Sequence, residues 1–382
     1  MSKIIEKSIN HKTPGWELTN GEIKLFLTED AGMHAPCDFF ADSTSPVNPY
    51  AVMHWNDERP DISFCPLLQN LRGDFFCLPF GDNPTPSGGF TYPPHGETAA
   101  NAWSLVSAVE EGEKTVFTFA MDTTVNPFHI EKRIEMRKGE SNLYLSHTVS
   151  GLEAKMPYGH HAICHMPEEG EKMYFSTKFD LGMTCPGVFS NNAAWEYQYL
   201  AAGETFDHLE KVPTAFKADP YHDFSTYPSP VGYADLFAML KKPDGTPGWS
   251  VAVYPERGYL FYTLRNPESL PAVTIWTCNS GRYAFPWDGK SRCFAIEDNH
   301  SFFAKGVQAS TEENDLTRLG WSTCGTFTKA APTVIPHIQG VIRVPADFGK
   351  VAHAFFENGT VIFKDMAGNT VSGKVDISFL GL

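Results

Sequence analysis

The chain has 382 residues, of which 42% are hydrophobic and 20% are charged, a composition typical of a folded globular protein. The formal net charge of -15 at pH 7 opposes binding to nucleic acid or anionic lipid, and no cluster of basic residues offsets it. The first ten residues lack the apolar core of a signal peptide, and no apolar run is long enough for a membrane helix. The eight cysteines include no CxxC pair, as is typical of free thiols in a reducing compartment. We expect a soluble, cytoplasmic protein with no nucleic-acid or membrane partner.

The first half of the chain contains a clear strand pair at residues 128–150. Apolar and charged side chains alternate along 130–136, and Lys138-Gly139-Glu140-Ser141 then forms a turn into a second apolar strand. Similar period-two segments bounded by turn residues occupy 22–27, 115–120, 250–254, 260–264 and 272–277. Many short strands of this kind, with 31 Gly and 28 Pro, predict an all-β protein built as a sandwich or a barrel.

Two features lie outside these strands. Long loops rich in aromatic residues and proline, at 77–94 and 212–232, are typical of loops that build a ligand site. From about residue 335 a new strand pattern begins: 352–357, an Asn358-Gly359 turn, 360–364, a further turn, and 370–380. We predict a main β domain over residues 1–330 and a small C-terminal β-hairpin appendage over 331–382.

The first polar motifs surround the first long loop. Arg72 and Gly73 precede a short apolar strand and Pro79-Phe80-Gly81, and an arginine there is by itself more typical of a structural ion pair than of a ligand site. His95-Gly96 is followed by Trp103; an imidazole can hydrogen-bond a sugar hydroxyl, and glycine allows close approach of a ligand or of another backbone.

The densest group of histidines comprises His160, His161 and His165. On a strand, His161 and His165 share one face while His160 points to the other, a spacing that also permits a metal site. No nearby carboxylate has convincing ligand spacing, so we expect no metal.

Glu297 closes an apolar strand, where desolvation would raise its pKa toward that of a general base; an edge-strand ion pair is the alternative reading.

In chain order, these segments resemble the galactose mutarotase-like superfamily, especially its aldose 1-epimerase and hexose-6-phosphate mutarotase branches. The resemblance covers about residues 15–327. Its motif-grade segments are Arg72-Gly73 with 77–81, His95-Gly96 with Trp103, the strand 159–167, and the strand 292–297 that ends in Glu297.

The resemblance implies a large antiparallel β-sandwich, the supersandwich of that superfamily, and an isomerase that interconverts sugar anomers. It implies Glu297 as the catalytic base and His161 as the catalytic acid, with His160 as a second candidate for the acid. Further side chains would bind the sugar: Arg72, His95, Trp103, His160 and Asp235, with Asp223 competing for the role of Asp235. No cofactor is required, and the partner is a small-molecule sugar, which the few cations of these segments suggest is neutral.

Three alternatives remain open. The first is a noncatalytic carbohydrate-binding protein on the same fold. The second is a hydrolase or lyase that pairs Glu297 with Asp235 or Asp298. The third is a metal-dependent isomerase that uses His161 and His165 with His95 and Glu97. The sequence predicts neither the sugar nor the oligomeric state.

Overall fold

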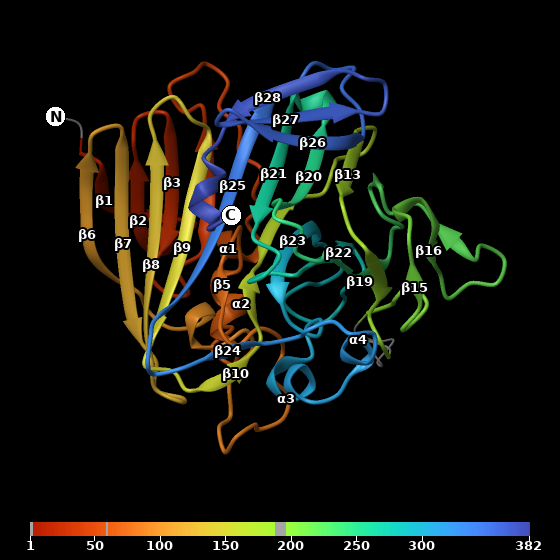
Figure 1. Ribbon diagram of the computed structural model, residues 1–382, viewed down its shortest axis with the longest axis horizontal. Helices are drawn as coiled ribbons and strands as arrows, with labels where there is room; N and C mark the ends of the chain where they lie inside the picture. Colours follow the sequence, from red (N-terminus) through yellow and green to blue (C-terminus); the bar gives the residue numbers. More distant parts are fainter. Residues whose placement is uncertain (1–2, 59, 188–195) are drawn as a thin grey trace. The chain divides into compact units, whose positions relative to one another are not determined.

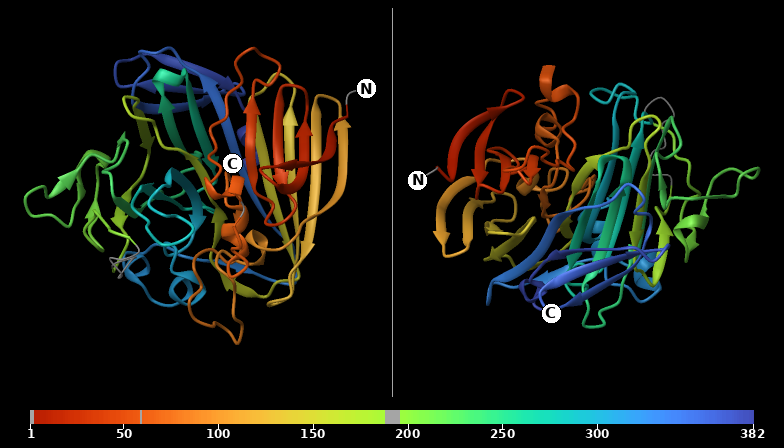
Figure 2. Two further views of the ribbon diagram at one scale, coloured as in Figure 1. Left: turned by 180° about the vertical axis from the view of Figure 1, so that it is seen from behind. Right: turned by 90° about the horizontal axis from the view of Figure 1, so that it is seen from above.

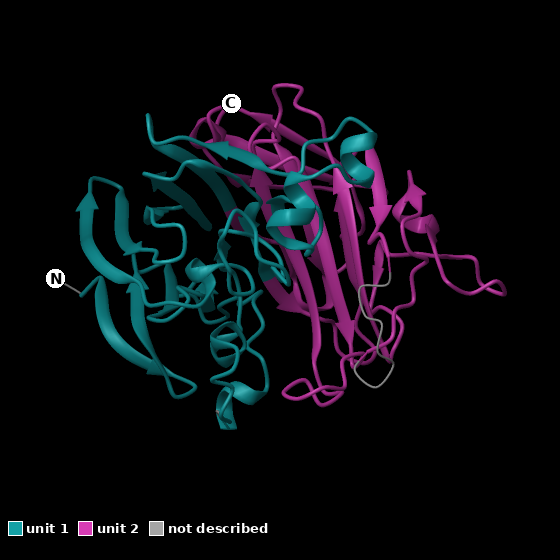
Figure 3. Ribbon diagram, turned by 90° about the horizontal axis from the view of Figure 1, so that it is seen from below, with its two compact units in different colours: residues 1–162, 298–338 teal, residues 163–297, 339–382 magenta. Residues whose placement is uncertain are grey.

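The computed structural model describes residues 3–58, 60–187 and 196–382. The chain divides into two compact units, residues 1–162 with 298–338 and residues 163–297 with 339–382 (Figure 3). Each unit therefore combines segments that lie far apart in the sequence. Strands β23 (Arg292–His300) and β25 (Thr333–Arg343) both include residues of the two units.

The first unit contains two antiparallel sheets of consecutive strands (Figure 1). One sheet consists of β1 (Ile5–Asn10), β2 (Thr13–Thr19), β3 (Ile23–Thr28) and β4 (His34–Phe39). The other contains the consecutive strands β6 (Ser104–Glu111), β7 (Lys114–Asp122), β8 (His129–Arg137) and β9 (Asn142–Ser150). Shorter elements join them: α1 (Trp55–Glu58), α2 (Pro66–Asn70), β5 (Phe76–Cys77), β10 (Ala154–Met156), β11 (Tyr158–His160), α3 (Gly306–Thr311), α4 (Asp315–Arg318) and β24 (Gly325–Phe327).

The predicted hairpin at 128–150 is confirmed by strands β8 and β9, which pair antiparallel with Ile130 opposite Val149. The period-two pattern of β8 buries Ile130, Lys132 and Ile134 completely. The lysine in this series is a polar side chain on an otherwise apolar face, so its amine must find a partner inside the unit.

The second unit contains the remaining long strands. Strands β14 (Leu181–Thr184), β19 (Tyr233–Leu240) and β22 (Ala272–Asn279) lie side by side, and β23 follows β22 in the same sheet. In another sheet β13 (Met173–Thr177), β20 (Gly248–Tyr254) and β21 (Tyr259–Arg265) are neighbours. Strands β19 to β22 are almost continuously buried, as expected for strands covered on both faces.

The C-terminal segment forms a three-stranded antiparallel sheet of β26 (Val351–Glu357), β27 (Thr360–Asp365) and β28 (Thr370–Lys374). The Asn358-Gly359 turn joins the first two strands, as predicted. Strand β26 contacts β13 and β20, and the small sheet can be followed in blue in Figures 1 and 2. The predicted strand at 370–380 is shorter in the structure and is followed by a 3-10 turn over Ile377–Leu380.

These antiparallel sheets confirm the predicted all-β class. No helix in the described part of the chain is long and apolar enough to cross a membrane.

Candidate functional site

The predicted site residues divide between the two units. The first unit holds Arg72, His95, Trp103, His160 and His161, and the second holds Asp235 and Glu297. Within the first unit the side chains form three separate groups: a pair of histidines, a larger buried cluster of histidines, and an arginine network.

The histidine pair consists of His95 and His161, whose ring centroids lie 5.3 Å apart at an interplanar angle of 82°. Phe75 stacks on His161 at 4.6 Å, and Phe80 meets His95 edge-on at 5.0 Å. Two imidazoles that the sequence separates by more than sixty residues therefore lie together between the rings of Phe75 and Phe80. The structure brings together these two of the predicted residues.

The backbone around His95 explains why glycine follows it. His95 has a φ of 58° and Gly96 a φ of 79°, and the His95 amide donates to the carbonyl of Gly81 at 2.7 Å. A Cβ atom on Gly96 would lie 2.1 Å from the carbonyl oxygen of Leu78. Only glycine allows this close approach of the two loop segments, which places His95 beside Phe80 and Phe75.

Both imidazoles of the pair are neutral at pH 7. Burial lowers the pKa of His95 to about 4, although Asp82 opposes the shift. Burial and the neighbouring His95 lower the pKa of His161 well below its usual value. A neutral imidazole offers one N–H donor and one acceptor nitrogen, so the pair can exchange hydrogen bonds and protons with a polar ligand.

His160 lies in a different environment from His161, as the alternation along the strand predicts. Its Nδ1 lies 2.9 Å from Oδ2 of Asp74, and its ring stacks on His337 with centroids 4.2 Å apart. His337 in turn has its Nε2 2.8 Å from Oδ2 of Asp298. Asp74 also accepts a hydrogen bond from the backbone amide of His161 at 3.1 Å, through Oδ1. Asp74 thus joins the buried cluster to the backbone of the histidine pair.

Trp103 belongs to this same buried cluster. Its ring lies 6.4 Å from that of His147, and the ammonium of Lys132 lies 4.9 Å from its centroid. Burial lowers the pKa of Lys132 to about 8, against the opposing charge of Asp74. Sequence reasoning missed Asp74, Lys132 and His147; only the inward position of a lysine in the apolar series of β8 gave a signal.

Arg72 is fully buried and its guanidinium is bound by protein groups. It donates to Asn56 Oδ1 at 2.6 Å, to Thr13 Oγ1 at 2.8 Å and to Asn10 Oδ1 at 2.9 Å. These bonds connect the short helix α1 to the first sheet. A role of Arg72 in holding a sugar stays a prediction.

Asp235 lies near the start of β19, opposite Thr277 of β22. Its Oδ1 accepts hydrogen bonds from the amides of Tyr199 and Leu200, both at 2.9 Å. Burial raises the pKa of Asp235 to about 7, because these two amides only partly replace the lost water. The carboxyl group is therefore near its titration point at neutral pH.

Glu297 lies on β23, which neighbours β22 in the same sheet as β19. Its side chain is buried, with only 2% of the residue exposed. The two predicted carboxylates of the second unit thus lie on strands separated by one intervening strand. The competing residue Asp223 accepts hydrogen bonds from Ser225 and Thr226 in a loop.

The second unit also contains an ion pair that the sequence did not predict. Arg282 pairs with Glu196 at 3.0 Å, and its guanidinium lies 4.5 Å from the ring centroid of Trp287. The two residues lie in loops far apart in the chain, so no local spacing could reveal the pair.

The residues considered for a metal site have other surroundings. Glu97 accepts hydrogen bonds from Thr124 and Val125 and anchors a loop. Burial lowers the pKa of His165 to about 4. No group of three His, Cys, Asp or Glu residues in the described ranges is arranged to hold a metal ion.

Several solved structures have a fold similar to that of this chain. No protein-family model and no curated protein sequence matches the chain. A structure from Klebsiella pneumoniae, provisionally assigned as an aldose 1-epimerase, is similar with a TM-score of 0.62 at 13% identity, over 90% of this chain and 84% of that one. A galactose mutarotase-like protein from Clostridium acetobutylicum has a TM-score of 0.56 at 13% identity, over 89% and 98%. A galactose mutarotase related enzyme from Lactobacillus acidophilus has a TM-score of 0.54 at 12% identity, over 86% and 97%.

The chain shares its fold with these three structures, which confirms the fold that the sequence motifs predicted. At these identities the likeness defines the fold and leaves the activity to be argued from the residues.

Proposed function

We propose that the protein is an aldose 1-epimerase-type isomerase that interconverts the anomers of a neutral sugar. The observation that carries the proposal is the pair of buried imidazoles, His95 and His161, enclosed by Phe75 and Phe80. Aromatic walls with a few fixed polar groups are typical of sites that bind small polar ligands. The fold likeness to proteins named as mutarotases supports the same reading.

The chemistry requires two proton transfers. A base removes the proton of the anomeric hydroxyl, the bond between C1 and the ring oxygen breaks, and an acid protonates that oxygen. The open-chain aldehyde then rotates about the C1–C2 bond, and the same steps in reverse close the ring on either face. Protons and electrons balance without a cofactor or a redox partner.

In this proposal Glu297 is the base and His161 is the acid. Burial keeps the His161 ring neutral, so the proton that the ring oxygen receives would come from the one ring N–H of this imidazole. His95 and Asp235 would hold sugar hydroxyls, His95 through its ring nitrogens and Asp235 through its carboxyl group. Holding the ring in a reactive position contributes more than either proton transfer alone.

A noncatalytic sugar-binding protein is the second candidate, and one observation favours it. The superfamily motif uses an arginine to hold sugar hydroxyls, whereas Arg72 donates to Asn10, Thr13 and Asn56 of the protein itself. Such a protein would bind sugars through the histidine pair without accelerating mutarotation.

The test is polarimetry on freshly dissolved aldoses, including glucose, galactose and xylose, in the presence of a chelator. We expect the wild type to accelerate mutarotation, and Glu297→Gln and His161→Asn each to lose at least about 100-fold of that rate, the usual contribution of a positioned acid or base. The matched controls are His129→Asn, at an exposed position of β8, and Glu131→Gln, at a half-buried position of the same strand; both should keep the full rate.

Three outcomes would separate the candidates. Full activity in Glu297→Gln would refute its role as the base. Loss of activity with chelator, restored by added metal, would favour the metal-dependent isomerase. Sugar binding by calorimetry with no acceleration on any aldose would favour the noncatalytic protein.

A further inference from the structure

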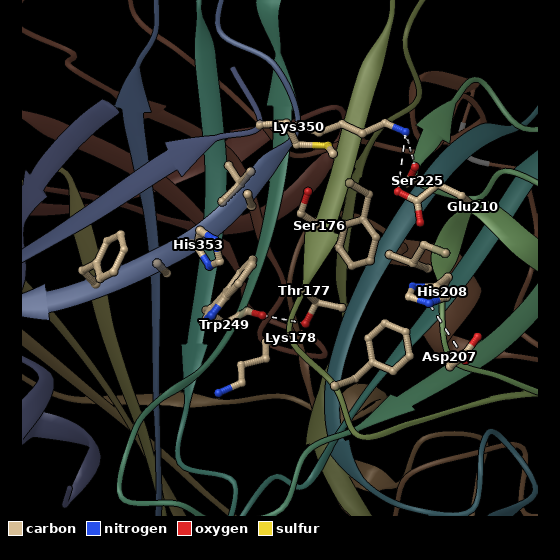
Figure 4. Close-up of a pocket in the computed structure, with 18 residues that line it drawn as sticks. Ser176, Thr177, Lys178, Asp207, His208, Glu210, Ser225, Trp249, Lys350 and His353 are labelled. Atoms are coloured by element: carbon tan, nitrogen blue, oxygen red, sulfur yellow. Dashed lines mark hydrogen bonds and ion pairs between the residues drawn. The ribbon is translucent and has the colours of Figure 1, made fainter. Parts of the chain in front are cut away.

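The second unit contains a pocket that none of the predicted site residues lines. Its volume is about 660 Å³, within the range of small-molecule sites. Three segments distant in sequence form its walls: residues 175–179 of β13 and its end, residues 207–210, and residues 350–355 of the C-terminal sheet (Figure 4).

One polar side chain of the pocket wall belongs to a mostly buried residue. Ser176 is only 8% exposed, and it lines the pocket. Figure 4 shows this side chain on the pocket wall between Lys350 and Thr177. The neighbouring Thr177 donates to the carbonyl of Trp249 at 2.6 Å. A hydroxyl on the wall of a pocket can both donate a hydrogen bond to a ligand and accept one from it.

Apolar rings lie beside this hydroxyl. The pocket is lined by Trp249, Phe179 and Phe355, of which Phe355 is 47% exposed. His353 also lines the pocket, and its ring centroid lies 6.0 Å from that of Phe355. Rings that present apolar faces next to hydroxyl and imidazole groups suit a ligand that has both C–H faces and hydroxyl groups.

The charges around the pocket compensate each other. Lys350 donates to Ser225 Oγ at 2.5 Å and to Asp223 Oδ2 at 3.3 Å. Lys178 lies 3.6 Å from Asp244, and the pocket walls add the carboxylates Asp207 and Glu210. A phosphorylated or carboxylated ligand would need cations that are free of such partners. The lining therefore favours an uncharged ligand.

We propose that this pocket is a second carbohydrate site, which binds an uncharged sugar unit of a larger glycan. Ser176 and His353 hydrogen-bond its hydroxyl groups, and the aromatic side chains cover its C–H faces. The proposal gives the C-terminal sheet a function, because β26 supplies one wall of the site. It does not depend on the proposed isomerase activity.

The experiment uses the full chain on an array of glycans that carries neutral, sialylated and phosphorylated members. All proteins carry Glu297→Gln, so that turnover of bound sugars at the proposed catalytic site does not complicate the comparison. The test variant is Ala352→Trp, which fills the pocket from an exposed position of β26. The matched control is Thr370→Trp, which adds the same side chain at an exposed position of β28 outside the pocket. Ser176→Ala removes only the hydroxyl group on the pocket wall.

We expect at least one class of neutral glycan to bind, with a tenfold or greater loss of signal in Ala352→Trp and no loss in Thr370→Trp. Ser176→Ala should weaken the same glycans. Thermal unfolding of each variant shows whether it is folded, and Ser176→Ala keeps the test valid if Ala352→Trp is not. Glycan binding that survives in both pocket variants, binding of charged glycans alone, or no binding at all would overturn the proposal.

Discussion

Two buried aspartates, one in each unit, have pKa values that are shifted in opposite directions. Burial by itself would raise the pKa of both. At Asp74 the hydrogen-bonded His160 and the nearby His34 outweigh burial and hold the pKa well below its usual range. At Asp235 the partners are two uncharged backbone amides, and the pKa rises to about 7. The partner therefore decides the charge state of a buried carboxyl group, and the depth of burial alone does not.

The same contrast separates the two regions as a whole. The first unit gathers His34, His147, His160 and His337 around Asp74 and Asp298, with Lys132 beside them. The pKa of Asp74 is lowered, which keeps this carboxylate ionised, and burial lowers the pKa values of His34, His147 and His160 and favours their neutral forms. The second unit places Asp235 without a basic side chain as its hydrogen-bond partner. Acidification should therefore destabilise the first region, whereas alkaline pH should destabilise the surroundings of Asp235.

The largest expected effect is the loss of stability in acid. Burial lowers the pKa of His34 to about 3 and of His95 to about 4, and lowers those of His147 and His161 as well. Because the unfolded chain binds these protons near pH 6.5 and the folded chain does not, stability falls as pH falls below 6.5. We expect a loss of at least about 4 kcal/mol between pH 7 and pH 5, measured by urea unfolding.

A single substitution sharpens that test. Both ring nitrogens of His147 are buried without a partner, and the ring stacks on Phe76 at 3.9 Å. His147→Phe removes one titrating group while keeping an aromatic ring, so it should make the acid dependence shallower by about one proton. His129→Phe, at an exposed position, should leave the dependence unchanged. Equal slopes for wild type and His147→Phe would contradict the interpretation.

The next largest effect is expected from Asp74→Asn. The change removes the negative charge that His160 contacts and weakens the acceptor of the His161 amide. Breaking a buried pair of this kind costs about 3 kcal/mol, measured by chemical denaturation at pH 7. The exposed His129–Asp122 pair offers a matched control, and Asp122→Asn should cost less than about 0.5 kcal/mol. Similar losses for both variants would remove the distinction between the two environments.

The smallest effect concerns Asp235→Asn. A carboxyl group with a raised pKa stabilises the folded state only while it is protonated, and that contribution is lost as pH rises through about 7. The amide keeps an acceptor for Tyr199 and Leu200 without the charge. We expect the variant to be more stable than wild type by about 2 kcal/mol at pH 8.5 and no more stable at pH 5, by thermal and urea unfolding. A wild-type advantage at pH 8.5 would show that the ionised form is stabilised.

Much of the fold could be predicted from local patterns in the sequence. The alternation in 128–150, the Gly139 turn and the Asn358-Gly359 turn predicted paired strands that the structure contains. The His95-Gly96 motif also has a local cause, since the positive φ of Gly96 and its contact with the Leu78 carbonyl require glycine. Such features depend on a few adjacent residues, so spacing alone reports them.

The contacts within the candidate site could not be predicted in the same way, because they join segments that are distant in the sequence. His95 meets His161, and His160 meets Asp74, across long stretches of chain. Arg72 shows the same difficulty: its motif is visible in the sequence, whereas its bonds to Asn10 and Asn56 are visible only after folding.

The sequence by itself determined the all-β class, the principal strands and the histidines and carboxylates worth considering, because hydrophobic periodicity and turn chemistry act over short distances. Only the tertiary structure decided which imidazoles lie together beside phenylalanine rings, which carboxylates keep their charge, and that the C-terminal sheet forms one wall of a pocket. Those properties depend on burial and on partners brought from remote parts of the chain, and no local pattern records either.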